Sequence, residues 1–383
     1  MRLFLIRPSH GNSFLCMRIF YDYQIFAMQK YGGVSRYFVE IALRINQYPG
    51  TRVRVVAPLY RNHLLAAKRN IIPVTGVNYA GDMPRATGIC LRFDAAVSRA
   101  LSMVYRPQLV HETFYSHNRT LGSRAKTVIT VYDMINELFA ESFPTSAEWR
   151  NMQRAAIHRA DHVICISEST RADLIRLYNI DPRITSVTHL ASSLAPSSNL
   201  LPPLEEPYFL YVGNRGGYKN YSGLLAAFGE SSLYKTHKFV CFGGGKLGKD
   251  EAEQIRRLGI PDHKILMMNG DDELLSRYYS AAVALVYPSL YEGFGIPLLE
   301  AMQCGCPVLC SNTSSMPEVA GDAAIYFEPA DPQSIASAML TVAQSPQERR
   351  RLISKGRSRA QEFSWDLCAR QTYSIYERLL SNA

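Results

Sequence analysis

Short β-rich runs of residues alternate with segments of helical periodicity along the whole chain. Runs of this length and composition are typical of strands, and the segments between them are typical of amphipathic helices. In the first half we predict strands near residues 18–21, 53–57, 109–111, 128–132 and 162–166. Helices are predicted near residues 34–46, 89–105, 148–160 and 169–177.

The same alternation restarts after residues 192–207, a segment rich in Ser and Pro that we interpret as a linker. Strands are predicted at residues 208–212, 239–242, 265–268, 283–287 and 307–309, each followed by a helix or a loop. This order indicates an α/β protein with parallel sheets. We therefore expect two doubly wound, Rossmann-like domains facing one cleft, with ligands at the carboxyl ends of the strands.

Composition supports a globular protein and disfavours several classes. A chain of 383 residues with 47% hydrophobic residues has room for two domains, and its longest apolar runs are too short to span a bilayer. The eight cysteines are scattered without a Cys-x-x-Cys motif, so we expect reduced thiols in a cytosolic protein and no metal site. Residues 1–16 make a poor signal peptide, and we expect them to be a non-native or disordered extension before a first strand at Met17.

Positive charge is concentrated in the first half of the chain. Residues 1–200 carry 24 Lys and Arg against 13 Asp and Glu, a net charge of +11, whereas residues 201–383 carry 18 against 20. A basic half indicates an anionic partner, such as phospholipid headgroups or a lipid-linked diphosphate, although plain solubility explains the charge equally well. Nucleic acid is not expected, because the Arg residues are dispersed and no binding motif is present.

The segment from Tyr287 to Glu300 carries the most specific chemistry. It places Glu292 and Glu300 around a Gly-Phe-Gly turn, with Pro297 expected at the first helical position and Glu300 in the first helical turn. Free N–H groups at a helix start attract phosphate, whereas carboxylates accept hydrogen bonds from hydroxyl groups. The loop therefore suits a ligand that is part phosphate and part sugar. The simpler alternative is that Glu300 complements the helix dipole and Glu292 is solvated.

This segment, together with residues 301–308 and 316–324, resembles the Glu-x7-Glu region of family 4 glycosyltransferases, which are retaining, use nucleotide-sugars and have the GT-B fold. The similarity runs from about Met17 to the last helix. It implies an acceptor-side domain at residues 17–195, a linker at 196–207 and a nucleotide-sugar-binding domain at 208–362. The helix at residues 363–383 is expected to cross back to the first domain.

The resemblance also implies roles for individual residues. Glu292 is expected to contact the transferred sugar and Glu300 the ribose of the sugar donor. Lys219 and Arg215 are expected to reach a common anion and to stabilise the leaving diphosphate, although their spacing departs from the usual one. Further contacts to the sugar donor are expected from residues of glycine-rich and strand-end loops, namely Gly32, Gly33, Gly213, Asn214, Gly244, Asn269, Gly270, Ser289, Gly293, Phe294 and Gly295.

On the acceptor side, Asp133 and His111 follow predicted strands and are expected to serve catalysis. Many relatives carry His-Asp where this chain has Tyr132-Asp133, which puts the usual contact of that His to the sugar in doubt. For His111, as for His189, a hydrogen-bonded structural histidine is the open alternative.

No Asp-x-Asp motif stands where a metal would bridge a diphosphate, and Asp271-Asp272 and Ser167 are interpreted as helix starts. We therefore expect a metal-independent site with no cofactor, whose sugar donor is a GDP- or UDP-sugar.

The sequence thus predicts a retaining hexosyltransferase that moves mannose or another hexose to a hydroxyl of a glycan or lipid-linked oligosaccharide in the assembly of bacterial lipopolysaccharide or a similar polysaccharide. We expect it in the cytoplasm or peripherally at the inner face of the plasma membrane, with the basic segment 61–70 as one candidate contact. Two alternatives remain open. One is an epimerase or a phosphorylase-like enzyme of the same fold, and the other is a non-catalytic protein that binds a partner through its basic half.

Overall fold

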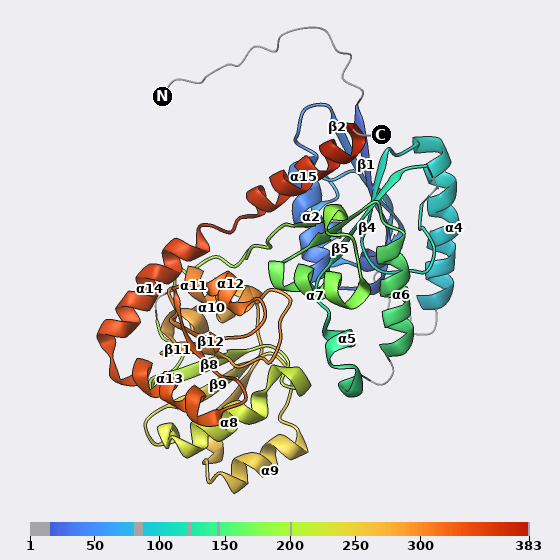
Figure 1. The fold of residues 1–383 in the computed structure, drawn as a ribbon. Coiled ribbons are helices and arrows are strands. Elements are labelled where there is room, and N and C mark those ends of the chain that lie inside the picture. The colour runs from blue at the N-terminus through green and yellow to red at the C-terminus, as the bar shows by residue number, and fades with distance from the viewer. Residues whose placement is uncertain (1–15, 80–86, 122–123, 144–145, 200, 382–383) are drawn as a thin grey trace, which may run out of the picture. The chain divides into compact units, whose positions relative to one another are not determined.

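The computed structural model describes residues 16–79, 87–121, 124–143, 146–199 and 201–381. All but one residue of the predicted extension at 1–16 therefore lie outside the described residues. The described chain forms two parallel sheets whose strands are separated by helices (Figure 1). The predicted α/β class with two doubly wound sheets is confirmed.

The first sheet has the strand order β3-β2-β1-β4-β5-β6-β7. β1 pairs in parallel with β2 and β4, with Ile19 opposite Val53 and Leu109. These are buried apolar residues, as expected for central strands covered on both faces. The strands are β1 (Met17–Tyr21), β2 (Thr51–Tyr60), β3 (Val74–Asn78), β4 (Leu109–Glu112), β5 (Lys126–Val131), β6 (His162–Cys165) and β7 (Thr185–Val187).

Helices and short 3-10 turns connect these strands. In Figure 1, α2 and α4 lie on opposite sides of β1 and β4, as in a doubly wound sheet. The elements are α1 (Gln24–Met28), α2 (Gly33–Ile45), α3 (His63–Lys68), α4 (Thr87–Tyr105), α5 (Ile135–Leu138), η1 (Ala140–Ser142), α6 (Ala147–His158), α7 (Glu168–Tyr178) and η3 (Pro182–Ile184).

The second sheet has the order β10-β9-β8-β11-β12-β13. Its strands are β8 (Tyr208–Val212), β9 (Lys238–Phe242), β10 (Ile265–Met268), β11 (Ala284–Tyr287), β12 (Val308–Ser311) and β13 (Ala324–Phe327). A core that includes Phe209, Phe228 and Met339 joins the sheet to α8 and α13. Figure 1 shows α8, α9 and α13 on one face of this sheet and α10, α11 and α12 on the other.

The remaining elements complete the second sheet and the end of the chain. They are η4 (Gly217–Lys219), α8 (Tyr221–Glu230), η5 (Leu233–Lys235), α9 (Lys249–Arg257), η6 (Asp262–Lys264), α10 (Asp272–Ala281), α11 (Ile296–Gln303), α12 (Met316–Ala320), α13 (Pro332–Gln344), α14 (Pro346–Ala360) and α15 (Trp365–Ser381). None of the helices in the described part of the chain is both long and apolar enough to cross a bilayer.

The strand order indicates where the second sheet can bind a ligand. From β8 the chain proceeds outward to β9 and β10, and from β11 it proceeds outward in the opposite direction to β12 and β13. The loops after β8 and β11 therefore diverge at the carboxyl end of the sheet and leave a crevice, the place where open α/β sheets bind ligands. The loops concerned are residues 213–220 and 288–295.

By the packing of its Cα atoms the chain divides into two compact units. The first unit comprises Met1–Phe114, Arg119–Val128 and Tyr373–Ala383, and the second unit comprises Tyr115–Asn118 and Ile129–Thr372. Each unit is described by itself below. The domain boundaries expected from the sequence stay predictions.

Candidate active site

An ion pair joins the two loops that diverge at the carboxyl end of the second sheet. The Lys219 Nζ lies 2.6 Å from the Glu292 Oε1, and both side chains are largely buried. The backbone supports the same junction, because the N–H of Leu290 donates to the carbonyl oxygen of Tyr218 at 2.7 Å. Two residues predicted to serve catalysis, 73 positions apart in the sequence, are thus brought together.

Two serines fix the backbone around Glu292. The Glu292 N–H donates to the Ser314 Oγ at 3.0 Å, and the Ser315 Oγ lies 2.8 Å and 3.0 Å from the carbonyl oxygens of Glu292 and Phe294. Ser315 is fully buried, so these bonds are shielded from competing water. The carboxylate therefore projects from a backbone that is held on both sides.

Aromatic rings enclose the ion pair. The Lys219 ammonium lies 5.2 Å from the ring centre of Tyr218 and 5.6 Å from that of Tyr287, within the range of cation–π attraction. Burial, and then the neighbouring Glu292 carboxylate, raise the pKa of the Tyr287 phenol. The phenol therefore stays neutral and can serve as a hydrogen-bond donor to a carboxylate at physiological pH.

Asp133 follows β5 in the second unit and lies just before the short helix α5, whose first residue, Ile135, donates its N–H to the Asp133 Oδ1 at 3.0 Å. Burial raises the pKa of this carboxyl group; the Ile135 N–H lowers it, and the Glu292 carboxylate raises it further. The Lys219 ammonium lowers the pKa of Asp133. The three charged residues thus belong to one electrostatic cluster.

A cavity of about 490 Å³ opens beside this cluster. Asp133 and Phe143 line it from the segment after β5, and Asn214, Tyr218 and Lys219 line it from the loop after β8. The cavity therefore presents a carboxylate, an ammonium, aromatic surface and the open backbone of Gly216 and Gly217. Such a mixture of polar and aromatic lining is typical of a small-molecule site.

Gly293 determines how closely the segment after β5 approaches the Glu292 loop. A Cβ on this residue would lie 1.8 Å from the carbonyl oxygen of Tyr132 and 3.0 Å from the Asp133 Cβ. No side chain larger than hydrogen fits there without a shift of the backbone. A glycine is therefore required for Asp133 and Glu292 to share one cluster.

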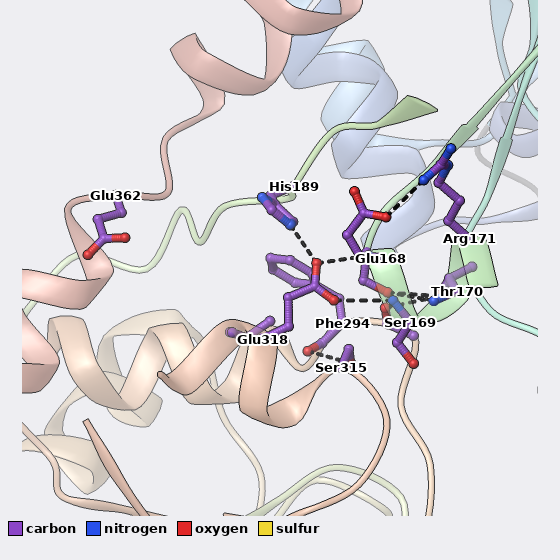
Figure 2. A network of polar contacts seen from close by, with 12 residues as sticks. Glu168, Ser169, Thr170, Arg171, His189, Phe294, Ser315, Glu318 and Glu362 are labelled. Atoms are coloured by element: carbon purple, nitrogen blue, oxygen red, sulfur yellow. Dashed lines mark hydrogen bonds and ion pairs between the residues drawn. The ribbon is translucent and has the colours of Figure 1, made fainter. Parts of the chain in front are cut away.

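A second polar network holds the other side of this loop (Figure 2). The Glu318 carboxylate of α12 accepts hydrogen bonds from the Glu168 N–H at 2.8 Å and the Ser169 N–H at 3.2 Å, and it lies 2.7 Å from the His189 Nε2. Glu168 and Ser169 form the first turn of α7, whose N–H groups have no partner within the helix. Glu318 thus supplies the anion that a helix start favours.

The first turn of α7 reaches the glycine loop directly. The Thr170 Oγ1 donates to the carbonyl oxygen of Gly293 at 3.2 Å, and Ser167 caps the helix by accepting from the Thr170 N–H. The cap expected at Ser167 is confirmed. The His189 and Phe363 rings lie 6.0 Å and 5.8 Å from that of Phe294. His189 is therefore hydrogen-bonded, as its structural alternative expects, and the choice between that alternative and a functional role stays a prediction.

Arg215 does not converge with Lys219. Its guanidinium bonds to Glu251, with the Arg215 Nε 2.8 Å from the Glu251 Oε1, and donates to the carbonyl oxygens of Gly243, Gly245 and Lys246. The expected common anion of the two cations is not what the structure shows, because a carboxylate and the glycine-rich loop after β9 satisfy Arg215. The role of Arg215 in holding a diphosphate stays a prediction.

Helix α11 begins one residue earlier than expected. Gly295 is its N-cap with φ of 99°, Ile296 is the first helical residue and Pro297 the second. The expected position of Pro297 was thus wrong by one residue, and Glu300 lies beyond the first turn because a left-handed glycine starts the helix earlier. The Glu300 Oε2 accepts a hydrogen bond from the Tyr279 hydroxyl at 3.0 Å.

Several residues expected to bind the sugar donor lie at the same carboxyl ends. Gly213 and Asn214 follow β8, Gly244 follows β9, and Asn269 and Gly270 are exposed after β10. Gly244 has φ of 72°, and a Cβ there would lie 2.8 Å from the carbonyl oxygen of Gly213.

Ser289, the second residue after β11, is fully buried, and its hydroxyl has no hydrogen-bond partner among the described residues. A buried hydroxyl without a protein partner is uncommon, and at this position it is a candidate ligand contact.

Three predicted residues belong to the first unit. Gly32 is the N-cap of α2 and Gly33 its first residue, so the expected helix start is confirmed. His111 is buried, and its Nδ1 lies 2.5 Å from the Tyr376 hydroxyl. Burial lowers the pKa of His111 to about 3, so the imidazole is neutral at physiological pH. The structural alternative for His111 therefore fits its surroundings, and its expected catalytic role stays a prediction.

Sequence reasoning did not find Glu318, Thr170, Ser314 and Ser315 as residues of the site. The Glu318 contact to Glu168 spans 150 positions in the sequence, and no local pattern marks such a pair. The one available signal was that residues 316–324, which include Glu318, take part in the family resemblance, because Pro-Glu at the start of α12 by itself resembles an ordinary helix start. Among the described residues no group of three or more His, Cys, Asp and Glu is arranged to hold a metal ion.

Comparisons with known proteins agree with this architecture. The family model of Glycosyltransferase Family 4 matches residues 31–190, and that of Glycosyl transferases group 1 matches residues 197–359. The O-antigen chain mannosyltransferase B of Escherichia coli is 31% identical over 282 residues, which cover 70% of this chain and 74% of that protein.

Solved structures with the same fold include sucrose-phosphate synthase from Thermosynechococcus elongatus, with a TM-score of 0.75 and 20% identity over 96% of this chain and 100% of the other. Anabaena HepE in complex with UDP-glucose has a TM-score of 0.70 and 18% identity over 95% and 100% of the two chains. This chain belongs to the family 4 glycosyltransferases, the group 1 glycosyl transferases, and has the GT-B fold.

Proposed function

We propose that this glycosyltransferase moves mannose from a nucleoside-diphosphate sugar to a hydroxyl of a bacterial surface glycan or its lipid-linked precursor, with retention of configuration and without a metal ion. The mannosyl specificity rests on the relative from Escherichia coli, which is an O-antigen mannosyltransferase. GDP-mannose is accordingly the first sugar donor to test, and UDP-sugars are the second.

The observation that carries the proposal is the Lys219–Glu292 pair beside the cavity after β8. An ammonium held in partly buried, aromatic surroundings is suited to oppose the negative charge that develops on a leaving diphosphate. A carboxylate next to it is suited to accept hydrogen bonds from sugar hydroxyls. The two groups therefore match the two halves of a nucleotide-sugar.

In the proposed reaction the bond between C1 of the sugar and the phosphate oxygen breaks, and the acceptor oxygen bonds to C1 from the same face. The acceptor proton passes to the leaving phosphate. Lys219 stabilises that phosphate, Glu292 holds the sugar, and Asp133 accepts a hydrogen bond from a hydroxyl group. Arg215 acts on the phosphate indirectly, by ordering the backbone of residues 243–246.

Thermal-shift measurements test the binding of the sugar donor. GDP, UDP and ADP are added to the wild type, to Lys219→Ala and to the matched control Lys264→Ala, each with magnesium and with EDTA. Lys264 also forms a 2.6 Å ion pair with a glutamate, Glu206. Lys264 precedes β10 and Glu206 precedes β8, so this pair lies at the amino ends of the strands, away from the candidate site. A nucleotide at ~100 times its Kd should stabilise the protein by ~2.7 kcal/mol.

We expect GDP to raise the Tm of the wild type and of Lys264→Ala equally in EDTA, and to raise that of Lys219→Ala much less. Equal shifts in Lys219→Ala and the wild type would contradict the assignment of Lys219. The absence of any shift with all three nucleotides would contradict the donor site as a whole.

A further inference from the structure

Helix α4 of the first unit exposes its large apolar side chains. Their exposed fractions are 71% for Ile89, 51% for Phe93, 72% for Met103 and 74% for Val104. The exposed Ala96 and Ala100 complete the series. Successive members are three or four residues apart, except that Met103 and Val104 are adjacent. Such spacing forms a single stripe along the helix, about 22 Å long at the rise of an α-helix.

The buried face of α4 mixes polar and apolar side chains, since Cys90 is buried and Leu101 and Tyr105 pack against a core cluster that includes Phe20. Asp94, Ser98 and Ser102 recur every four residues and are almost entirely withdrawn from solvent. The Asp94 Oδ1 accepts a hydrogen bond from the Leu59 N–H at 2.8 Å, whereas its Oδ2 and the Ser98 Oγ have no partner among the described residues. An ordinary surface helix exposes polar side chains and keeps its large apolar side chains on the buried face. The chain's own core therefore does not explain the apolar outer face.

Positive charge accompanies the apolar stripe. Arg92 and Arg99 are exposed on α4, and Arg106 is exposed immediately after it. Asp94, the one acidic residue in the sequence of α4, is buried, so the exposed side chains of this helix carry cations and no carboxylate. Apolar residues flanked by arginines are the pattern of helices that lie in the interface of a membrane.

A cavity of about 740 Å³ lies at the C-terminal end of the stripe. Among the described residues, its lining contains four arginines and no acidic residue: Arg99, Arg106, Arg119 and Arg124, with Met103 and Leu121 among the apolar contacts. Guanidinium groups bind phosphate in a bidentate manner, and the apolar wall continues the exposed face of α4. The cavity therefore suits the phosphate of a lipid headgroup.

We propose that α4 docks this protein onto a membrane surface rich in anionic phospholipids, with the stripe Ile89–Val104 among the headgroups and the four arginines around lipid phosphates. This inference rests on the proposed function, because a lipid-linked acceptor is presented at such a surface. It relocates the membrane contact considered for residues 61–70, where the structure has the six-residue helix α3.

Charge argues for a membrane over a second copy of the chain. A two-fold symmetric contact through α4 would place the arginines of one copy near those of the other. Like charges at an interface oppose association, whereas anionic headgroups complement the whole face.

Vesicle sedimentation of the full chain tests the proposal. The vesicles consist of phosphatidylcholine alone or of phosphatidylcholine with phosphatidylglycerol. The variants are Ile89→Ser with Phe93→Ser, and the triple change Arg92→Gln, Arg99→Gln and Arg106→Gln. Val77→Ser, which alters an exposed valine of β3, is the matched apolar control, and Arg69→Gln is the charge control.

We expect the wild type and both controls to bind the anionic vesicles and not the neutral ones. The triple change should weaken binding roughly 100-fold, since each cation near such a surface contributes substantially. High salt should weaken wild-type binding as well. The thermal shift with GDP should be the same in all of these proteins, so failure of the docking surface is distinguished from failure of the donor site.

Three outcomes would overturn the proposal. These are wild-type binding no stronger to anionic than to neutral vesicles, unchanged binding in both α4 variants, and a dimer in analytical ultracentrifugation that α4 substitutions dissociate while vesicle binding persists. Any of them would assign the exposed face of α4 to a different partner.

Discussion

At the scale of single residues, the site depends on charges that compensate one another away from water. Lys219 and Glu292 each lose hydration, and their 2.6 Å contact offsets that loss only while both are present. The aromatic rings of Tyr218 and Tyr287 keep the pair partly dry. A single substitution therefore leaves the other charge without its partner, with consequences for stability as well as for chemistry.

Glu292→Gln keeps the shape of the side chain and removes its charge. We expect the free energy of unfolding to fall by up to ~3 kcal/mol, as for a broken buried pair, and sugar transfer to fall by ~100-fold or more. Chemical denaturation and a transfer assay measure the two effects. Lys264→Ala, which breaks an ion pair with a partly exposed glutamate, serves as control and should retain transfer. Full transfer by Glu292→Gln would remove this residue from the mechanism.

For Glu292, loss of the charge is expected to lower both stability and activity, whereas for Asp133 it is expected to raise stability and lower activity. Because its pKa is raised in the folded state, chiefly by burial, the stabilising contribution is greatest below the usual pKa of an Asp and is lost as pH rises through the raised value. Asp133→Asn can keep the hydrogen bond from the Ile135 N–H and removes the buried charge. We expect this variant to have a higher Tm than the wild type at pH 7 and lower activity.

The difference in Tm between Asp133→Asn and the wild type should shrink as the pH is lowered toward 4. Thermal unfolding of the two proteins across this range checks the sign. If Asp133→Asn were less stable than the wild type at pH 7, the folded protein would favour the charged carboxylate, and the raised pKa of Asp133 would be contradicted.

At the scale of elements, the site is made where loops from different strands press together. The loop after β11 is held by α7 through Thr170, by the start of α12 through Ser315 and by the segment after β5 through Gly293. None of these contacts is local in sequence. The geometry of Glu292 is therefore a property of packed elements, and a change in any of them should move it.

Gly293→Ala tests the closest of these approaches. The new methyl group would overlap the carbonyl oxygen of Tyr132, so we expect a loss of ~1–3 kcal/mol in stability and a marked loss of transfer. Gly88→Ala is the control, because a Cβ at Gly88 has no neighbour within 4 Å. Equal stability and activity in the two variants would contradict the requirement for glycine beside Asp133.

Glu318 is a positioning residue that acts through α7. Its burial raises its pKa, but the hydrogen bonds from His189 and from the N–H groups of Glu168 and Ser169 outweigh this and lower it. The resulting stability is present above the usual pKa of a Glu and is lost as the pH falls through the lowered value. Glu318→Gln should therefore lose ~2 kcal/mol at pH 7, and the loss should diminish in acid.

Glu362→Gln is the matched control for this prediction, since the exposed Glu362 forms an ion pair with Arg359. In Figure 2 no dashed contact joins Glu362 to the network of Glu318. A role in positioning also predicts that Glu318→Gln lowers kcat more than it raises KM. A uniform loss of stability with unchanged kinetics would mean that Glu318 serves the fold alone.

At the scale of the whole molecule, most strands could be predicted because apolar runs separated by helical periodicity specify buried parallel strands. The three that sequence reasoning missed have weak patterns: β3 contains Gly76, β7 has three residues, and β13 is bounded by polar turns. The sequence also predicted ligand binding at the carboxyl ends of the strands, whereas the strand order that makes the loops after β8 and β11 diverge came from the structure.

Side-chain partners could not be predicted in the same way. Lys219 was expected near Arg215, four positions earlier, but its partner is Glu292, whereas Arg215 bonds to Glu251. Short spacing suggested a shared anion, and the competing carboxylates became visible only in three dimensions. Residue types at strand ends thus indicated the region of the site, and tertiary packing determined which groups face one another.

The most direct test of the proposed function is the product of the reaction itself. GDP-mannose and a lipid-linked glycan acceptor are incubated with the wild type in EDTA, and NMR follows the anomeric configuration of the transferred sugar. We predict a glycan product with the α configuration of the sugar donor from the wild type, and at least ~100-fold less product from Glu292→Gln. A product of inverted configuration, or GDP released without any glycan product, would contradict the proposal.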